Sequence, residues 1–194
     1  MKSNRLEAFT DGVLAIAITV MVLELRVPTG GTFHDLRLEQ PKLLAYVLSF
    51  VYLAIYWNNH HHLMQVVDRV DGRVLWANMH LLFWLSLVPF GTAWMGEHAR
   101  ESAPVIVYGV MLLGAGVAYY LLTRALLALH DTSSALAIAL GKDWKGKVSV
   151  LAYVVALALA GVATWLALVI FIAVAIVWLI PDRRIARVVD GGAR

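Results

Sequence analysis

A run of 33 residues without a charged side chain, VSVLAYVVALALAGVATWLALVIFIAVAIVWLI at positions 148–180, is the strongest constraint on how this chain folds. About 20 consecutive apolar residues suffice for a helix to cross the hydrocarbon core of a bilayer. The whole chain of 194 residues is 61% hydrophobic and 15% charged, whereas soluble domains carry about a quarter charged residues. The sequence therefore predicts an all-α integral membrane protein.

The apolar runs between polar breaks predict a single transmembrane domain, residues 1–194, with six spanning helices. The 33-residue run is too long for one span, so we divide it near Gly161–Thr164; one long tilted helix is the alternative. The expected helices lie near 5–26, 42–65, 73–96, 103–129, 146–162 and 165–181.

The Lys and Arg residues between these helices predict their orientation, because cytoplasmic loops carry an excess of them. With the N-terminus in the cytoplasm, twelve Lys and Arg residues fall on the cytoplasmic side and four on the outer side. We therefore expect six spans with both termini in the cytoplasm.

Several other functional classes lack their characteristic residues. The chain has no Cys, and we find no basic-aromatic strip for nucleic acid and no catalytic Ser–His–acid set, zinc motif or carboxylate pair. His60, His61 and His62 are consecutive on a helix and point about 100° apart, so they cannot all bind one metal ion. We expect neither an enzyme nor a cofactor or metal centre.

The first helix has two different faces. At about 100° per residue, one stripe holds Phe9, Gly12, Ile16, Thr19 and Leu23. If several copies of this helix surround a common axis, Ile16 and Leu23 form apolar rings with a layer of Thr19 hydroxyls between them. Apolar rings can close a pore by dewetting, and hydroxyls can replace part of an ion's hydration shell. The alternative is a plain seam between two helices.

Asp11 lies on the opposite side of the first helix, and a carboxylate in the bilayer normally faces protein or a water-filled cavity. Trp57 and His61 are four residues apart, so they share a face of the second helix and both are candidate partners. Further candidates are Arg5, Asn58, His60, His62, Asn78 and His80. The alternative is that Thr10 or Asp11 caps the N-terminus of the first helix.

The stretch RLEAFTDGVLAIAITVMVLEL resembles the start of the transmembrane-protein-175 family of potassium channels. The family signature R-x-x-x-F-S-D reads Arg5, Phe9, Thr10 and Asp11 here, with Thr in place of the usual Ser. WNNHHHLM in the second helix and NMHLLFWLSLVPFGTAW, which begins at Asn78, also resemble the family pattern. The matches cover the first three helices, about half of the chain.

This resemblance implies one six-helix unit per chain and a homotetramer whose four first helices line the pore. It implies an apolar constriction with a nearby threonine layer, at the positions of Ile16, Thr19 and Leu23. It also implies that Phe9 and Asp11 tie the first helix to the second and third. No T-V-G-Y-G filter motif occurs in the chain.

We therefore expect a leak-like channel in the plasma membrane that passes potassium better than sodium, with potassium near Thr19 only in transit. Its partners are other copies of the chain and the lipid bilayer, and Glu24 near the outer mouth raises the local cation concentration. Two alternatives stay open. One is a proton-coupled transporter that uses Asp11 and the histidines, and the other is a non-conducting membrane scaffold.

Overall fold

The computed structural model describes residues 3–67, 69–130 and 144–179, and within these ranges the ordered elements are all helices. They are α1 (Ser3–Leu23), α2 (Phe33–Leu38), α3 (Gln40–Gln65), α4 (Gly72–Ser86), α5 (Val88–Glu97), α6 (Ser102–Leu129), α8 (Trp144–Ala160) and α9 (Thr164–Leu179). The all-α prediction is thus confirmed.

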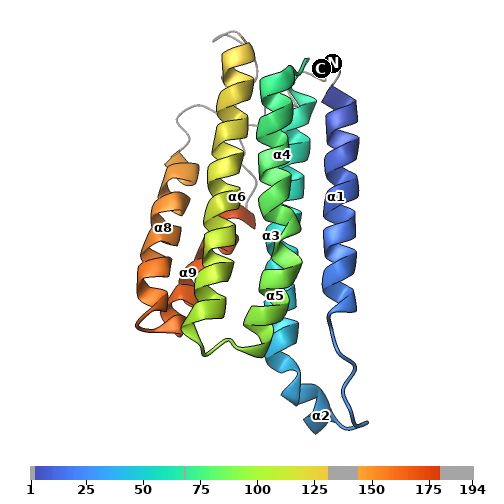
Figure 1. Cartoon of the computed structure of the whole chain (residues 1–194), viewed down its shortest axis with the longest axis vertical. Coiled ribbons are helices and arrows are strands. Elements are labelled where there is room, and N and C mark those ends of the chain that lie inside the picture. The colour runs from blue at the N-terminus through green and yellow to red at the C-terminus, as the bar shows by residue number, and fades with distance from the viewer. Residues whose placement is uncertain (1–2, 68, 131–143, 180–194) are drawn as a thin grey trace.

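The long helices lie side by side along one direction, with α8, α6, α4 and α1 in the front layer of Figure 1 and α3 and α9 behind them. Neighbouring helices of the front layer pack on one another: α6 contacts α4 and α8, and α1 contacts α4. Helix α1 also contacts α3 and α5. The short helix α2 lies beyond one end of this bundle.

Two apolar clusters hold the bundle together. The first joins α1 to α3, α4 and α6 through side chains that are almost completely buried, among them Leu14, Leu53, Leu81 and Leu122. The second joins α3, α5 and α6 to α8 and α9 around Tyr108, Tyr153 and Phe171. Small residues allow the close approach that helix packing in lipid requires. Ala156 and Ala160 of α8, for example, are fully buried.

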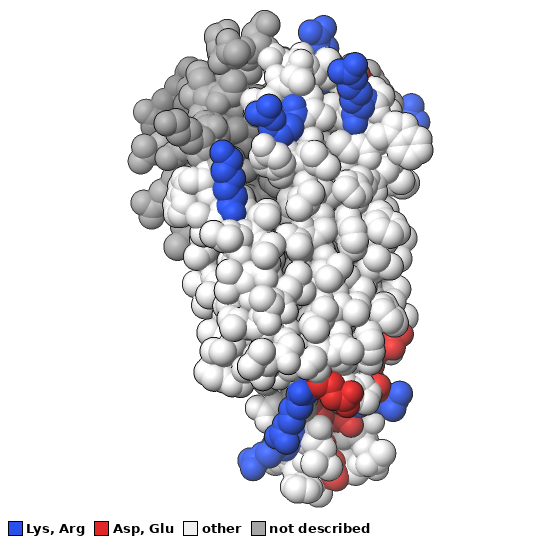
Figure 2. Space-filling model, turned by 60° about the vertical axis from the view of Figure 1, so that its left-hand side comes forward, with Lys and Arg blue, Asp and Glu red and all other residues white. Residues whose placement is uncertain are grey.

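On the face drawn in Figure 2, the charged side chains lie toward the two ends of the bundle, with an uncharged band between them. Such a band suits the hydrocarbon layer of a membrane. Three helical stretches are long and apolar enough to span it by length and composition, namely Ser3–Leu23, Gly72–Glu97 and Ser102–Leu129. Thr164–Leu179 is a shorter apolar helix. Six spans and the orientation of the termini stay predictions.

The helix expected at 73–96 consists of two segments, α4 and α5, with a break at Leu87. Pro89 lies in the first turn of α5, where its missing N–H costs least. The Thr92 hydroxyl donates to the Val88 carbonyl at 2.7 Å, which ties the first turn of α5 together. The boundary between the last two helices is a turn, since α8 ends at Ala160 and α9 begins at Thr164.

The sequence interpretation missed α2, which lies in the connection after α1. Its capping box joins Thr32 and Asp35: the Asp35 N–H donates to the Thr32 hydroxyl at 3.3 Å, and the Thr32 N–H donates to the Asp35 carboxylate at 3.0 Å. Hydrogen bonds from the hydroxyl and the N–H of Thr32 hold the pKa of Asp35 below its usual value. This helix therefore has a defined start although it is only six residues long.

Candidate functional site

One face of α1 is buried against α3, α4 and α5. It consists of residues three or four positions apart, as expected for one side of a helix. Leu14, Ala17 and Met21 are each at most 5% exposed, and Leu6 and Thr10 continue the same face toward the start of α1. The bundle thus fixes how α1 is rotated about its own axis.

The stripe predicted from the sequence is the face of α1 that the bundle leaves open. Ile16 is 66% exposed and Leu23 is 78% exposed. Thr19, which lies between them, and Gly12, one turn before Ile16, are also exposed. The Thr19 hydroxyl donates to the Ala15 carbonyl at 2.8 Å, so its proton is satisfied within α1. The hydroxyl oxygen therefore has acceptor capacity for a ligand on the open face.

A groove runs along this open face between α1 and α5. Ile16, Val20 and Glu24 form the α1 side, and Pro89 and Phe90 belong to the opposite wall. Glu24 is exposed at the end of α1, where no described residue forms an ion pair with it. Its carboxylate therefore remains available to attract cations.

Asp11 lies two turns inside α1, which begins at Ser3, so it does not cap the start of this helix. The Trp57 indole N–H donates to the Asp11 carboxylate at 3.0 Å. Trp57 also stacks on His61, with ring centroids 5.6 Å apart and 12° between the planes. His61, which we had considered as a second partner of Asp11, contacts Glu7 through Nδ1 at 2.7 Å instead.

Thr10 forms a second link, and it is fully buried. The Asn78 side-chain amide donates to the Thr10 hydroxyl at 3.0 Å, and the amide oxygen of Asn78 lies 3.0 Å from Nε2 of His60. All three side chains are at most 1% exposed. Helices α1, α3 and α4 are thus joined by a chain of hydrogen bonds away from lipid, where such groups need partners.

The position of one signature residue, Phe9, differs from what the resemblance implied. Phe9 is 51% exposed on the open face of α1, so it does not lie in the contact with α3 and α4 where Thr10 and Asp11 lie. Arg5, a candidate partner of Asp11, is exposed and forms no ion pair with a described residue. The hydrogen bonds that join α1 to its neighbours therefore come from Thr10, Asp11 and Glu7.

The three consecutive histidines do not share one partner: His60 contacts Asn78, His61 contacts Glu7 and Gln65, and His62 contacts Gln65. Within the described ranges, no group of three or more His, Asp or Glu side chains could hold a metal ion. Sequence reasoning missed Glu7, whose signal was its position four residues before Asp11 on the same side of the helix.

Sequence reasoning also missed a cluster of buried hydroxyl groups that joins α3, α5 and α6. The Thr92 hydroxyl lies 2.6 Å from Ser49 Oγ, which in turn lies 2.8 Å from the Tyr108 hydroxyl. No sequence periodicity connects three residues on three helices, so only the fold reveals this cluster.

Comparison with known proteins matches this arrangement to one family. Residues 5–89 fit the family model described as endosomal/lysosomal potassium channel TMEM175. A potassium channel of Chryseobacterium sp. (strain P1-3) is 46% identical over 187 residues, which cover 96% of this chain and 97% of that protein. A potassium channel of Streptomyces collinus is 37% identical over 126 residues, 61% of each chain.

A solved structure has the same fold. The crystal structure of a lysosomal potassium-selective channel TMEM175 homolog from Chamaesiphon minutus superposes with a TM-score of 0.80 at 30% identity. The superposition covers 93% of this chain and 97% of that one. The identity, the coverage and the fold agree, and we conclude that this chain is a membrane protein of the TMEM175 family, a family of ion channels and not of enzymes.

Proposed function

We propose that this chain is a potassium channel in which four copies surround a pore lined by α1. The observation that carries the proposal is the division of α1 into two faces. Thr10, Asp11 and Met21 anchor one face to the bundle, while Ile16 and Leu23 remain open on the other. The names of the bacterial relatives, which are potassium channels, support the same function.

Around a fourfold axis, the open faces of α1 would meet and form stacked rings. Ile16 and Leu23 are seven residues apart, two turns, so their rings lie about 10 Å apart along the pore. Narrow apolar rings expel water and close the pore when they approach one another. Both residues are therefore the constriction in our proposal.

Thr19 supplies the polar layer between these rings. Its hydroxyl donates to the Ala15 carbonyl, so the lone pairs of the oxygen remain able to accept. Four such oxygens favour a weakly hydrated cation over a strongly hydrated one, because they replace only part of the hydration shell. This is the basis of our proposed preference for potassium over sodium, and Glu24 concentrates cations at the outer mouth.

The proposed channel spans the plasma membrane six times, with both termini in the cytoplasm. The face drawn in Figure 2 carries an uncharged band between two charged ends, which supports a transmembrane position. The Lys and Arg excess on one side supports the orientation.

Reversal potentials of the purified protein in liposomes test the function. With potassium on one side and sodium on the other, we expect a reversal potential shifted toward the potassium equilibrium value. Equal permeability would contradict potassium preference, and saturable proton-dependent uptake without channel steps would contradict the channel itself.

The absence of Cys from the chain provides a direct test of the assembly. A single Leu23→Cys substitution should yield disulfide-linked dimers upon oxidation, because the axis brings Leu23 of neighbouring copies together. The matched control is Val110→Cys, on an exposed face of α6 and at 40% exposure. Efficient linkage of the control, without linkage at position 23, would contradict α1 at the axis.

A further inference from the structure

A cavity lies inside the protomer, away from the open face of α1. Its walls come from α3, α6, α8 and α9, and its volume of about 40 Å³ is enough for a few water molecules. Six of its residues are aromatic and carry a hydroxyl or indole group: Tyr52, Tyr56, Tyr119, Tyr120, Tyr153 and Trp178.

Several polar groups of this cavity are already paired. The Trp178 indole N–H donates to Ser149 Oγ at 2.8 Å, and the Tyr52 hydroxyl donates to the Phe171 carbonyl at 2.6 Å. The Tyr56 hydroxyl, in contrast, has no hydrogen-bond partner among the described residues. It can therefore donate a hydrogen bond to a polar group that enters the cavity.

Basic side chains lie close in sequence to residues that line the cavity. Arg124 is one turn beyond the lining residue Tyr120 on α6, and Lys145 and Lys147 flank the lining residue Gly146 on α8. The Lys145 ammonium lies 5.9 Å from the centre of the Trp178 ring, which is itself part of the wall. We call Arg124, Lys145 and Lys147 the basic rim. Figure 2 shows that Lys and Arg side chains predominate at this end of the molecule.

The length of α8 brings the rim to the level of lipid headgroups. Its 17 residues span only about 25 Å, less than the roughly 30 Å of a bilayer core. Lys145 and Lys147 lie in its first turn, so in a bilayer their long stems would let the ammonium groups reach the headgroups. Arg124 and Lys147 are exposed or face outward from the bundle, and neither forms an ion pair with a described residue.

We propose that the basic rim and the cavity behind it form a binding site for the headgroup of an anionic phospholipid. The cations of the rim contact the phosphate, and the aromatic and hydroxyl wall receives the polar part of the headgroup. The acyl chains lie on the exposed apolar side chains further along α6 and α8, such as Leu121, Leu151 and Val155. A lipid fits better than free phosphate because the cations adjoin this apolar surface.

Native mass spectrometry of the purified full-length chain with added phosphatidylglycerol or phosphatidylcholine tests this site. We expect selective retention of phosphatidylglycerol. The double variant Arg124→Gln/Lys147→Gln should weaken retention by about 25-fold, because each cation near an anionic surface contributes roughly five-fold. Both side chains lie at the surface of the bundle, so the variant should keep its fold, which its thermal midpoint checks.

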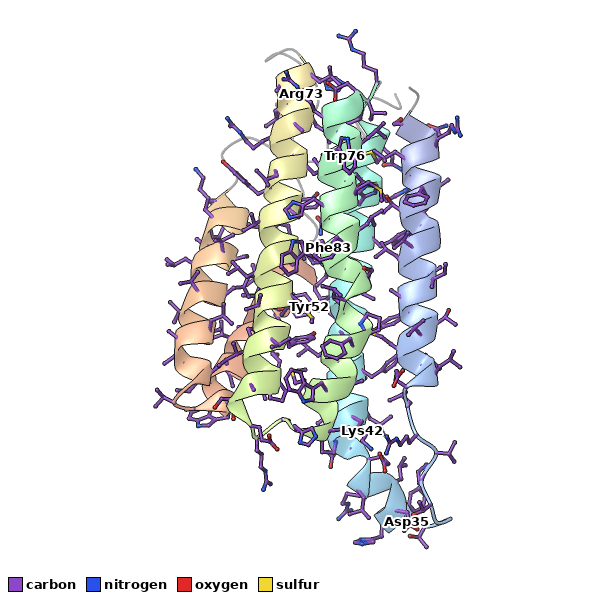
Figure 3. The ribbon with its side chains drawn as sticks, in the orientation of Figure 1. Asp35, Lys42, Tyr52, Arg73, Trp76 and Phe83 are labelled. Atoms are coloured by element: carbon purple, nitrogen blue, oxygen red, sulfur yellow. The ribbon has the colours of Figure 1, made fainter. Side chains whose placement is uncertain are left out.

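The matched control is Arg69→Gln/Arg73→Gln, which removes two positive charges near the start of α4, where Figure 3 labels Arg73. Neither residue lines the cavity. This control should leave phosphatidylglycerol retention within about two-fold of the unaltered chain. Equal losses in the two double variants would overturn the site, because they would indicate attraction by net charge alone. Equal retention of both lipids, or displacement of the lipid by inorganic phosphate at millimolar concentration, would also overturn it.

A third variant tests the cavity separately. A Cβ atom at Gly116 would lie 3.7 Å from Tyr153 and 3.9 Å from the Tyr56 hydroxyl, which are ordinary contact distances. Gly116→Ala therefore narrows the cavity without strain and should reduce phosphatidylglycerol retention several-fold. Unchanged retention in this variant would overturn the role of the cavity in binding. None of these outcomes depends on ion conduction, so the site can fail while the channel proposal stands.

Discussion

The side-chain amide of Asn78 donates a hydrogen bond to the hydroxyl of Thr10 at 3.0 Å, across 68 positions of sequence and with both side chains buried. This bond joins α4 to α1 in the part of the bundle where Trp57 holds Asp11. Together the two contacts determine which face of α1 turns away from the protomer. The chemistry of the open face thus depends on polar groups that lie behind it.

Replacement of Thr10 tests this dependence. Thr10→Val keeps the shape of the side chain but leaves the Asn78 amide without its acceptor, which should cost about 1–3 kcal/mol of stability. Thr10→Ser keeps the hydroxyl and should remain within about 1 kcal/mol of the unaltered chain. Thermal unfolding in detergent, followed by circular dichroism, measures both. Equal losses in the two variants would indicate that packing of the methyl group, and not the hydrogen bond, stabilises this contact.

Replacement of the apolar ring residues tests the constriction. Ile16→Asn or Leu23→Asn should raise the potassium current several-fold at equal protein density, because an amide keeps water in a narrow ring. Val110→Asn, an equivalent change on an exposed face of α6, should leave the current unchanged. Currents from reconstituted protein in planar bilayers provide the measurement. If neither α1 variant changes the current, the constriction lies elsewhere.

Thr19 tests the proposed selectivity. Thr19→Val removes the hydroxyl with little change in volume and should bring the potassium-to-sodium permeability ratio closer to one. Thr19→Ser retains the oxygen and should retain most of the preference. Reversal potentials under bi-ionic conditions give the ratio. A ratio that is preserved in Thr19→Val would exclude the hydroxyl layer as the source of selectivity.

Two glycines in α6 provide a matched test of helix packing. A Cβ atom at Gly114 would overlap the Trp84 ring of α4, whereas one at Gly116 meets only ordinary contacts. Gly114→Ala should therefore destabilise the protein by about 1–3 kcal/mol through overpacking. Gly116→Ala should be neutral or stabilising by up to about 1 kcal/mol, the gain in helix propensity. Chemical unfolding in detergent measures the difference, and equal effects would mean that Trp84 moves aside freely.

The open stripe of α1 was predictable because helical periodicity depends only on residue spacing. Ile16, Thr19 and Leu23 share a face in any α-helix, and the long apolar runs require helices in a membrane. The partner of Asp11 was predictable for the same reason, since Trp57 is one of few polar groups available at that end of α3.

Other features depend on contacts between helices, which the spacing of residues along one helix does not determine. His61 was a candidate partner of Asp11, but Glu7 lies one turn closer to the end of α1 and takes the contact. Phe9 belongs to the signature, yet its exposure follows from the rotation of α1 that Thr10 and Asp11 determine. The break at Leu87 depends on how one proline is accommodated where α4 meets α5.

Because α1 has two different faces, we expect substitutions along this helix to fall into two groups with different effects. Substitutions at Leu14, Ala17 and Met21 should lower the amount of protein recovered from the membrane, since these side chains fill the bundle interior. Those at Ile16, Thr19 and Leu23 should leave the amount unchanged and alter the ion flux per molecule. Plotted against residue number, the effects on protein amount and on ion flux should each repeat every 3.6 residues, with their maxima at different positions. Measurements of expression and flux in living cells would therefore reveal how α1 is rotated about its axis.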